Sequence, residues 1–409
     1  MSLLKQRKNI PDDWINCELG EVLTLQRGYD LPHRLRKDGE VPIISSSGVS
    51  GRHDKAMVSP PGVVTGRYGT IGEIFYVNEP FWPLNTTLYV RDFRGMTAEY
   101  AYHYLKTINF ASHSGKSGIP GVNRNDVHKE IVYFPINKIE QTAIVNILTD
   151  TDVLITELEN LISKKQAIKT ATMQQLLTGR TRLTQFAQYP NGTIKNYKSS
   201  ELGLIPEDWE VARLAQVAKV IDPHPSHRAP PEESYGVPFV GIGDLNESGE
   251  LINSEVRRVN QSILQEHSER YTLHNQPIGL GRVASIGKVI RLRLGKEPYA
   301  ISPTLGVIDG FACTNDFLFY YLKSESVTEQ FSRVMSGSTR SSVGMNVLKE
   351  ILVVKISIEE QISIAAILSD MDAELKALEQ KLAKFRAIKQ GMMQQLLTGR
   401  IRLPLEQQP

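Results

Sequence analysis

Three short motifs in this sequence contain residue types that could do chemistry. Residues 115–117 (Gly-Lys-Ser) match the end of a phosphate-binding loop, but that loop needs an earlier glycine where this chain has Phe110. Gly279, Gly281 and Ala284 have the spacing of a dinucleotide fingerprint, yet the residues that follow are typical of a strand rather than the required helix. We therefore predict neither a nucleotide site nor a dinucleotide site.

The third motif, Asp222 with His224 and His227, contains residue types that bind metal ions. Two prolines lie among them and no further ligand follows at a metal-site spacing, so we interpret these residues as parts of a loop. The sequence also lacks a nucleophile elbow and a carboxylate–histidine zinc motif. We therefore expect no catalytic group, no metal and no cofactor bound by this chain.

Basic and serine side chains gather in the loops of both halves of the chain. Arginine binds phosphate groups, or guanine through two hydrogen bonds, and serine hydroxyls bind either. A solvated surface charge remains an equally good explanation for any one of these arginines. The candidate DNA-contacting residues are Arg27, Arg34, Ser45, Ser46, Ser47, Arg52, Arg67, Lys116, Arg124, Arg257, Arg258, Arg282, Lys288 and Arg340.

The composition excludes several classes of protein. Hydrophobic residues make up 41% and charged residues 22% of the 409 residues, which is typical of folded domains rather than of a disordered chain. The longest apolar runs are far shorter than the roughly 20 residues of a membrane-spanning helix, so we expect no membrane partner. Two cysteines in different halves favour a reducing cytoplasm over a disulfide framework. Because the net charge is only +2, any DNA-binding surface must be local.

An internal duplication dominates the sequence. Residues 173–183 (MQQLLTGRTRL) and 393–403 (MQQLLTGRIRL) agree at ten of eleven positions, at an offset of 220. Residues 10–14 (IPDDW) correspond to residues 205–209 (IPEDW) at an offset of 195, so the second copy carries net insertions. The sequence between these anchors is mostly different in the two copies. A repeated frame with different interiors predicts two related but unequal surfaces about a pseudo-twofold axis.

Each copy ends in a long stretch that is typical of a helix closed by glycine. The first runs from Glu140 to Gly179 and the second from Glu359 to Gly399. Thirty-nine residues correspond to about 58 Å of helix, which is longer than a usual globular helix. Because apolar residues recur at spacings of three and four, we predict that the two helices pair as an antiparallel coiled coil rather than lie in separate cores. The predicted seam residues are Leu148, Ile155, Leu158, Ile162, Leu368, Met371, Leu375, Leu378, Leu382 and Phe385.

The first long helix also carries a second apolar row, which widens its apolar face. A single seam binds one partner helix, whereas a wider stripe can bind a helix and something more. The residues of this second row are Ile147, Leu154, Leu161 and Ile168.

The rest of the chain alternates short β-type runs with turn residues and short helical stretches. This pattern predicts two mixed α/β domains with long loops, and hence an α+β fold in which these domains are separated by the two long helices. The Gly-Arg pairs at residues 66–67 and 281–282 fall at corresponding places in the two domains. We divide the chain into a first globular domain at 1–138, a central helix at 139–180, a linker at 181–202, a second globular domain at 203–357, a C-terminal helix at 358–403 and a tail at 404–409.

Taken in order along the chain, these motifs resemble those of the DNA-specificity (S) subunit of type I restriction-modification systems. The resemblance covers nearly the whole chain. It lies in residues 197–209 (YKSSELGLIPEDW), in the Glu-Gln pairs at 140–141 and 360–361 that open the long helices, and in the QQLLTGR segments at 174–180 and 394–400 that close them. The one departure is that no clear copy of the Tyr-Lys-Ser-Ser-Glu segment precedes the first repeat.

The resemblance implies that domains 1–138 and 203–357 are target-recognition domains, each recognising one half of a split DNA sequence. The helices would set the length of the spacer and bind two methylation subunits, which would bring S-adenosylmethionine and flip the target adenine. Motor-nuclease subunits would join for cleavage. Residues 156–159 and 372–375 resemble the short repeat whose copy number sets spacer length in some members. Because the two domains differ, we predict an asymmetric bipartite target and a chain that is not catalytic by itself.

Two other classes of protein remain open from the sequence. An autonomous DNA methyltransferase would need a cofactor pocket and an Asn/Asp-Pro-Pro-aromatic loop, which neither residues 222–224 nor residues 229–232 supply. Methylation of DNA by the purified chain alone would favour that class. A structural coiled-coil adaptor would explain the helices but not the loop arginines, and an absence of salt-sensitive DNA binding would favour it.

Overall fold

The structure, a computed structural model, describes residues 11–114, 121–226, 228–252, 255–295, 297–336 and 342–404. The chain divides into two compact units. Unit 1 comprises residues 1–161 and 378–409, and unit 2 comprises residues 162–377. Both long helices run from one unit into the other, so each unit contains one globular domain together with a part of each helix. Among the described residues, no helix is both long and apolar enough to span a bilayer.

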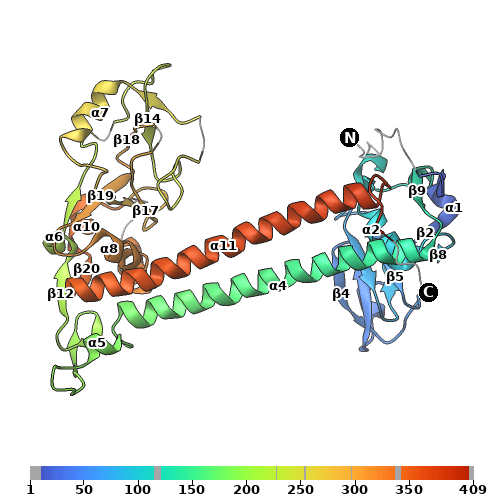
Figure 1. The fold of residues 1–409 in the computed structure, drawn as a ribbon, viewed down its shortest axis with the longest axis horizontal. Coiled ribbons are helices and arrows are strands. Elements are labelled where there is room, and N and C mark those ends of the chain that lie inside the picture. The colour runs from blue at the N-terminus through green and yellow to red at the C-terminus, as the bar shows by residue number, and fades with distance from the viewer. Residues whose placement is uncertain are drawn as a thin grey trace. The chain divides into compact units, whose positions relative to one another are not determined.

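The globular domain of unit 1 consists of small sheets and short helices (Figure 1). Its strands are β1 (Trp14–Glu18), β2 (Leu23–Arg27), β3 (Val41–Ser45), β4 (Gly48–His53), β5 (Gly62–Gly66), β6 (Ile74–Val77), β7 (Trp82–Pro83), β8 (Thr87–Phe93) and β9 (Ile131–Pro135). Its helices are α1 (Leu19–Val22), α2 (Ala98–Leu105) and α3 (Arg124–His128), with 3-10 turns η2 (His33–Leu35) and η3 (Phe110–His113).

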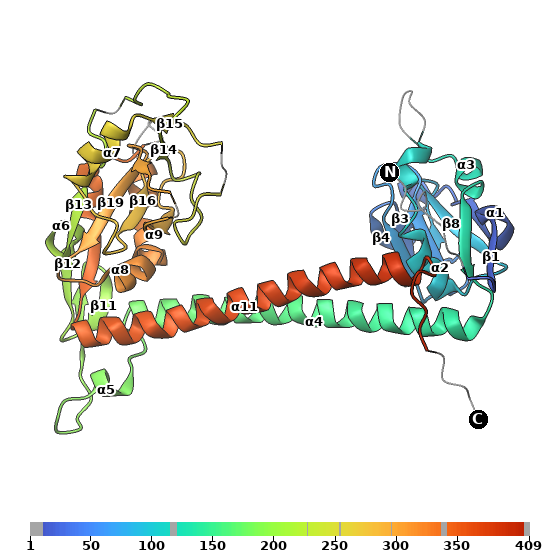
Figure 2. The ribbon, with the colours of Figure 1, turned by 45° about the horizontal axis from the view of Figure 1, so that its top comes forward.

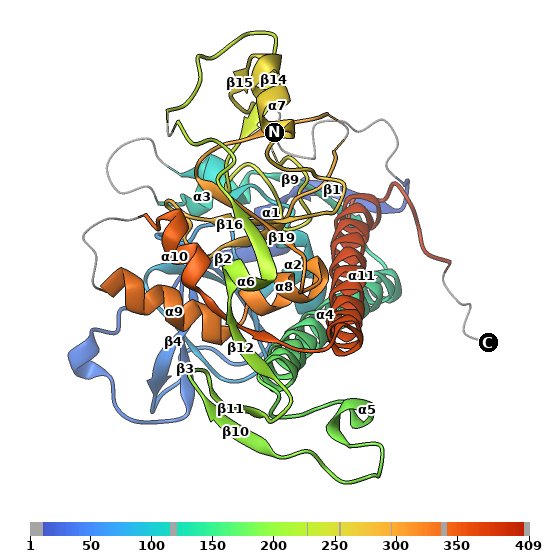
Figure 3. The same ribbon diagram turned by 90° about the vertical axis from the view of Figure 1, so that its left-hand side faces the viewer.

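The globular domain of unit 2 is built in the same way, with additional helices (Figure 3). Its strands are β10 (Tyr197–Ser200), β11 (Gly203–Pro206), β12 (Glu210–Arg213), β13 (Ala218–Ile221), β14 (Val237–Val240), β15 (Arg258–Val259), β16 (Ile278–Gly281), β17 (Val289–Arg291), β18 (Ala300–Ile301), β19 (Leu305–Gly310) and β20 (Leu352–Lys355). Its helices are α5 (Thr184–Ala187), α6 (Leu214–Val217), α7 (Gln261–Ser268), α8 (Asn315–Leu322), α9 (Glu325–Ser336) and α10 (Met345–Glu350).

The two domains share one sheet topology even where their sequences differ. The four-stranded sheet has the order β2-β8-β5-β6 in unit 1 and β13-β19-β16-β17 in unit 2. The three-stranded sheet has the order β4-β3-β7 in unit 1 and β15-β14-β18 in unit 2, and in each of them one strand pair is parallel. A two-stranded antiparallel pair, β1 with β9 or β12 with β20, completes each domain. The duplication found at the helix ends therefore extends through the sheets.

The two long helices, α4 (Lys138–Leu177) and α11 (Ile358–Leu396), lie side by side (Figures 1 and 2). In unit 1, Asp152 of α4 pairs with Lys389 of α11, and Glu159, further along α4, pairs at 2.6 Å with Arg386, which lies earlier in α11. The helices are therefore antiparallel. In unit 2 the equivalent of the first pair, at an offset of 220, joins Lys169 to Asp372. The predicted fold class, two mixed α/β domains with two long helices in an antiparallel coiled coil, is confirmed.

The burial of the helix side chains follows the predicted seam. Leu148 and Leu368 are fully buried, and Leu158 and Leu375 are nearly so. The other seam residues are half-buried, namely Ile155, Ile162, Met371, Leu378, Leu382 and Phe385. The second apolar row of α4 lies mostly outside the seam, because Leu154, Leu161 and Ile168 are 44%, 38% and 42% exposed.

Each hydrophobic core contains the beginning of one long helix and the end of the other. In unit 1 the buried cluster joins Trp14 of β1 with Leu148 of α4 and Leu396 of α11. In unit 2 the corresponding cluster joins Trp209 with Leu177 of α4 and with the start of α11. Each core therefore contains residues from both repeats.

A buried salt-bridge cluster anchors the end of α4 in unit 2. Arg182 donates to the carboxylate of Glu360 at 2.9 and 2.7 Å and to that of Asp208 at 2.9 and 3.1 Å. Burial lowers the pKa of Arg182, but its hydrogen bonds to Glu360 and Asp208 outweigh burial and raise that pKa above its usual value. Glu360 is only 2% exposed, and Arg182 is its charged partner inside the domain.

Unit 1 repeats this cluster at the end of α11. Arg402 donates to Glu140 at 2.9 and 2.7 Å and to Asp13 at 3.0 and 2.8 Å, and these hydrogen bonds raise the pKa of Arg402. Arg402 and Glu140 are the equivalents of Arg182 and Glu360. The second arginine of the repeated TGRxRL segment thus has the same structural role at both helix ends.

A glutamine fastens the start of each long helix to its own domain. The side chain of Gln361 accepts from Thr314 N at 2.7 Å and donates to Ile356 O at 2.9 Å. Gln141 likewise accepts from Thr97 N at 2.8 Å and donates to Pro135 O at 2.8 Å. Both glutamines are completely buried and bind main-chain groups. The Glu-Gln pairs that open the helices therefore attach them to the domains.

The glycines that close the long helices have the left-handed conformation expected of a C-terminal cap. Gly179 has φ +70°, and a Cβ there would lie 2.5 Å from Pro206 Cδ and 3.0 Å from Trp209 Cη2. We expect Gly179→Ala to lower the free energy of unfolding of unit 2 by more than about 2 kcal/mol, because backbone strain and this overlap add. Gly192→Ala is the matched control: Gly192 has φ +83° but nothing within 4 Å of the added Cβ. Equal losses in urea denaturation would contradict the packing argument.

The segment predicted as a linker at 181–202 is ordered into local structure. It contains α5 and strand β10, which forms a hairpin with β11 (Figure 3). The hydroxyl of Tyr197 donates to Gly179 O at 2.9 Å, so the hairpin is attached to the end of α4. Its residues are all exposed or half-buried, and the sequence had not indicated the pairing of β10 with β11.

Candidate nucleic-acid interface

Two candidate arginines of unit 1 lie at the end of the four-stranded sheet where β8 begins, which we call the sheet edge. Arg27 ends β2 opposite Leu88, and Gly66 ends β5 opposite Thr87, so Arg27 and Arg67 lie on either side of the start of β8. The main chain of Arg67 is fixed there, because its N–H donates to Thr86 O at 2.8 Å. The register of the sheet, rather than proximity in sequence, brings these two cations to one edge.

The three candidate serines lie next to this edge. Ser45 Oγ accepts from Ser47 N and donates to Gly48 O at 2.9 Å, which fixes the tight turn between β3 and β4. A Cβ at Gly66 would lie 3.1 Å from Ser46 Cβ, so the serine turn touches the loop that carries Arg67. The structure therefore brings the predicted serines and Arg67 together.

The guanidinium group of Arg67 stacks on an aromatic neighbour. Its Cζ lies 4.6 Å from the centre of the Tyr68 ring, and Tyr68 packs so closely on Gly121 that a Cβ there would lie 2.2 Å from it. Within the described part of the chain, Arg67 takes part in no ion pair. Val122 N donates to Arg67 O at 2.9 Å, which brings the exposed Arg124 to the same region. Sequence reasoning missed Tyr68, although an aromatic residue directly after a loop arginine was a usable signal.

The remaining candidates of unit 1 differ in their surroundings. Arg27 lies 3.7 Å from Asp30 in an exposed pair, and Arg34 is exposed within η2. Arg52 lies at the opposite end of the β3–β4 hairpin from the serine turn and is 3.6 Å from Glu40. Lys116 lies outside the described residues, as does the whole Gly-Lys-Ser motif.

In unit 2, the equivalent loop arginine is held inside the domain. Arg282 is 7% exposed and donates to Val343 O at 3.1 Å, and it lies 3.4 Å from a carboxylate oxygen of Asp222. Gly281 ends strand β16, and the chain returns as strand β17 rather than as the helix that a dinucleotide fold requires. Arg282 is therefore a buried residue that joins segments of its own domain.

The other candidates of unit 2 mostly bind the protein itself. Arg258 forms a two-pronged pair with Glu297 at 2.6 and 3.0 Å, which raises the pKa of the arginine. Arg257 donates to Pro230 O, and Lys288 donates to Ile242 O at 3.0 Å. Arg340 lies outside the described residues. The structure thus does not gather the candidates of unit 2 at one sheet edge as it does in unit 1.

The histidine motif forms a buried hydrogen-bonded chain. His224 Nδ1 lies 3.1 Å from His267 Nε2, and His267 Nδ1 lies 3.1 Å from the hydroxyl of Tyr271. Because His224 Nε2 lies 2.9 Å from Arg228 O, which can only accept, neutral rings satisfy every contact. Burial, and secondarily His224, lowers the pKa of His267 to about 4. No set of three metal-binding side chains occurs among the residues that the structure describes, and His227 is not one of those residues.

A cation that the sequence analysis did not select lies beside the helix pair in unit 1. The ammonium group of Lys106 lies 3.7 Å from the centre of the Tyr102 ring. Burial lowers the pKa of Lys106 to about 8, and Lys389 contributes in the same direction. The sequence around Lys106 did not indicate this lowered pKa, because Lys389, which contributes to it, belongs to the other repeat.

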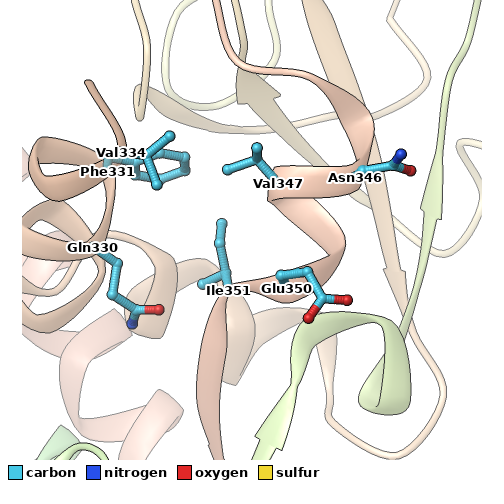
Figure 4. A pocket seen from close by; sticks show the side chains of 7 residues that line it. All are labelled: Gln330, Phe331, Val334, Asn346, Val347, Glu350 and Ile351. Atoms are coloured by element: carbon cyan, nitrogen blue, oxygen red, sulfur yellow. The ribbon is translucent and has the colours of Figure 1, made fainter. Parts of the chain in front are cut away.

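An apolar pocket of about 330 Å³ lies between α9 and α10 in unit 2. Phe331, Val334, Val347 and Ile351 point toward one another across it (Figure 4). Its polar neighbours serve the fold: Gln330 bonds both main-chain groups of Leu352, and Glu350 pairs with Arg213. The pocket presents no set of groups suited to catalysis.

Comparison with known proteins gives consistent matches. The profile of the type I restriction modification DNA specificity domain matches residues 11–170 and 206–384. The specificity subunit of the type I restriction enzyme MjaVIII from Methanocaldococcus jannaschii is 25% identical over 309 residues, which cover 73% of this chain and 68% of that protein. The specificity subunit of type I restriction enzyme EcoDI from Escherichia coli is 23% identical over 430 residues, which cover 96% of this chain and 89% of that protein.

The fold is similar to that of two solved structures. One is the S subunit of a type I restriction-modification system from M. genitalium, with a TM-score of 0.60, 16% identity, and coverage of 97% of this chain and 98% of that chain. The other comes from work on complex assembly and conformational transition of the type I system, with a TM-score of 0.54, 16% identity, and coverage of 97% and 100%. At such identities these two structures support the fold, whereas the profile matches well over half of the sequence in two copies. The chain therefore belongs to the family of type I restriction-modification DNA specificity subunits.

Proposed function

We propose that this chain recognises an asymmetric bipartite sequence in double-stranded DNA and is not catalytic by itself. The domains at 1–138 and 203–357 each bind one half of the target. The observation that carries this proposal is one sheet topology used twice. At equivalent places, Arg67 is only half-buried in one copy and Arg282 is buried in the other. Equal folds with unequal edge chemistry suit two different half-sites.

The long helices set the spacer between the half-sites and bind two methylation subunits, which bring S-adenosylmethionine. Motor-nuclease subunits join this complex for cleavage. Support comes from the exposed apolar row of α4, where Leu154 and Leu161 are 44% and 38% exposed although the helix is already paired. An apolar row of this kind suits a partner helix, and a pseudo-twofold repeat suits two copies of one partner.

The test is to co-express the full chain with the methylation subunit of its own system and to map the modified adenines in the host DNA. We expect a divided, asymmetric motif. Exchange of residues 1–138 for the corresponding domain of another family member should change one half of that motif. Exchange of residues 203–357 should change the other half, and thus serves as the matched control. An undivided or symmetric motif, or a change in both halves from a single exchange, would contradict the proposal.

A further inference from the structure

The sheet registers relate individual residues of the two domains. Gly66 pairs with Thr87 in unit 1 and Gly281 pairs with Leu305 in unit 2, so β8 and β19 can be aligned at these pairs. On the other side of the same strands, Gln26 pairs with Tyr89, and Ile221 pairs with Val307. Tyr89 and Val307 each lie two residues after the aligned residues Thr87 and Leu305, so their partners Gln26 and Ile221 are equivalent. The next residues, Arg27 and Asp222, therefore occupy the same position, at the offset of 195 that also relates the first repeat anchors.

The main chain holds the two loop arginines in the same way. Arg67 N donates to Thr86 O at 2.8 Å, and Arg282 N donates to Thr304 O at 2.8 Å. The carbonyl of each arginine then accepts from a valine N–H further along the chain, at 2.9 Å in unit 1 and 2.8 Å in unit 2. The difference between the two arginines thus lies in their side chains.

We attribute this difference to the residue at the Arg27/Asp222 position. In unit 2 the carboxylate of Asp222 lies 3.4 Å from Arg282 and helps to hold it inside the domain. In unit 1 that position is occupied by Arg27, which pairs with Asp30 at 3.7 Å and offers Arg67 no carboxylate. Arg67 lies over the ring of Tyr68 instead, with Cζ 4.6 Å from the ring centre, and has no ion pair among the described residues.

We propose that Arg67 contacts a base pair in the half-site recognised by unit 1 and determines specificity there, whereas Arg282 is a structural brace that contacts no base. This inference rests on the proposed function. The planar guanidinium group presents two parallel N–H donors, which match O6 and N7 of guanine, and its position over the Tyr68 ring limits its movement. Ser46, in the turn beside Arg67, adds a short hydroxyl group at the same edge.

The test uses the full chain in complex with its methylation subunits and compares Arg67→Lys with Arg67→Ala. Lysine keeps the charge but lacks the planar pair of donors. For a base contact, both variants should reduce discrimination at one G·C pair by about 10- to 100-fold and leave the other half of the motif unchanged. For a phosphate contact, lysine should keep most of the affinity and every sequence should be weakened equally. That second outcome would overturn the assignment.

Arg27→Asp tests the cause of the difference by giving unit 1 the carboxylate of unit 2. We expect this variant to draw Arg67 into the domain and to reduce discrimination at the same base pair as Arg67→Ala does. If Arg27→Ala reduced discrimination at that base pair equally, the effect would come from the removal of Arg27 itself. The proposed attraction of Arg67 by a carboxylate at position 27 would then be wrong. Arg91→Ala is the matched control, because Arg91 is an exposed arginine on β8 that donates to Gln26 at 3.2 Å. It removes the same charge and should leave the motif unchanged.

Two readouts separate a failure of this inference from other failures. Thermal unfolding of Arg67→Lys should match that of the wild-type chain, since a lysine can keep the cation–π contact with Tyr68 and no ion pair of Arg67 within the described residues is lost. A wild-type complex that gives no divided motif would overturn the proposed function and this inference with it. A divided wild-type motif that Arg67→Lys leaves intact would overturn only the role of Arg67.

Discussion

Replacement of Arg182 by alanine is expected to lower the free energy of unfolding of unit 2 by about 3–5 kcal/mol. The arginine side chain is 5% exposed and that of Glu360 is 3% exposed, so the variant leaves a carboxylate buried without its cation. The indole N–H of Trp209, 3.2 Å from Glu360, cannot compensate a full charge. Urea denaturation followed by hydrogen exchange of unit 2 peptides measures the loss.

Two variants show whether the loss comes from the unpaired charge. Arg180→Ala removes an exposed arginine two positions earlier and should change stability by less than about 0.5 kcal/mol. Adding Glu360→Gln to Arg182→Ala removes the buried charge, and should recover part of the loss. A double variant as unstable as the sum of its single variants would mean that the two side chains contribute independently.

Acidification from pH 7 to pH 5 is expected to destabilise unit 2 by about 2 kcal/mol through His267 alone. The folded-state pKa of His267 is about 4 and its ordinary value is 6.5. Between these values the unfolded chain binds a proton that the folded chain does not, so stability is highest above pH 6.5 and falls as the pH falls toward 4. Protonation would also place a proton on His267 Nδ1, which in the neutral ring accepts from Ile301 N at 3.3 Å.

The measurement is urea denaturation across this pH range, with hydrogen exchange of β18, where Ile301 N lies 3.3 Å from His267 Nδ1, as the local reporter. His267→Gln should be less stable at pH 7 but should lose this component of the pH dependence. His274→Gln, which changes an exposed histidine of the same unit, should keep it. If His267→Gln kept the full slope between pH 7 and pH 5, the buried histidine chain would not be its cause.

Much of the framework was predictable because its signals are local. Helix periodicity, the absence of proline and a closing glycine are properties of neighbouring residues, so α4 and α11 were placed within a few residues of their ends. The repeated TGRxRL segment was also visible in the sequence, although the salt bridges made by its second arginine were not. Arg402 binds Glu140, 262 residues away, and no local pattern links them.

In the candidate site, too, some features follow from neighbouring residues, whereas others depend on contacts between segments far apart in the sequence. Two Gly-Arg pairs at corresponding places predicted two equivalent arginines, and their main chains are indeed equivalent. Their side chains have different surroundings: Asp222 lies 3.4 Å from Arg282 in unit 2, whereas the equivalent residue of unit 1 is Arg27. The register that brings these residues together depends on which strands pair, and strand pairing joins segments far apart in the sequence.

By itself, the sequence determined the duplication, the two long helices with their apolar seam, and the resemblance to a DNA-specificity family. The tertiary structure alone decided which charges are buried, which helix end completes which core, and which loop arginine is available to a ligand. The physical reason is that helix formation depends on contacts three and four residues apart, whereas the charge state and availability of a side chain depend on whatever the fold places within a few ångströms of it.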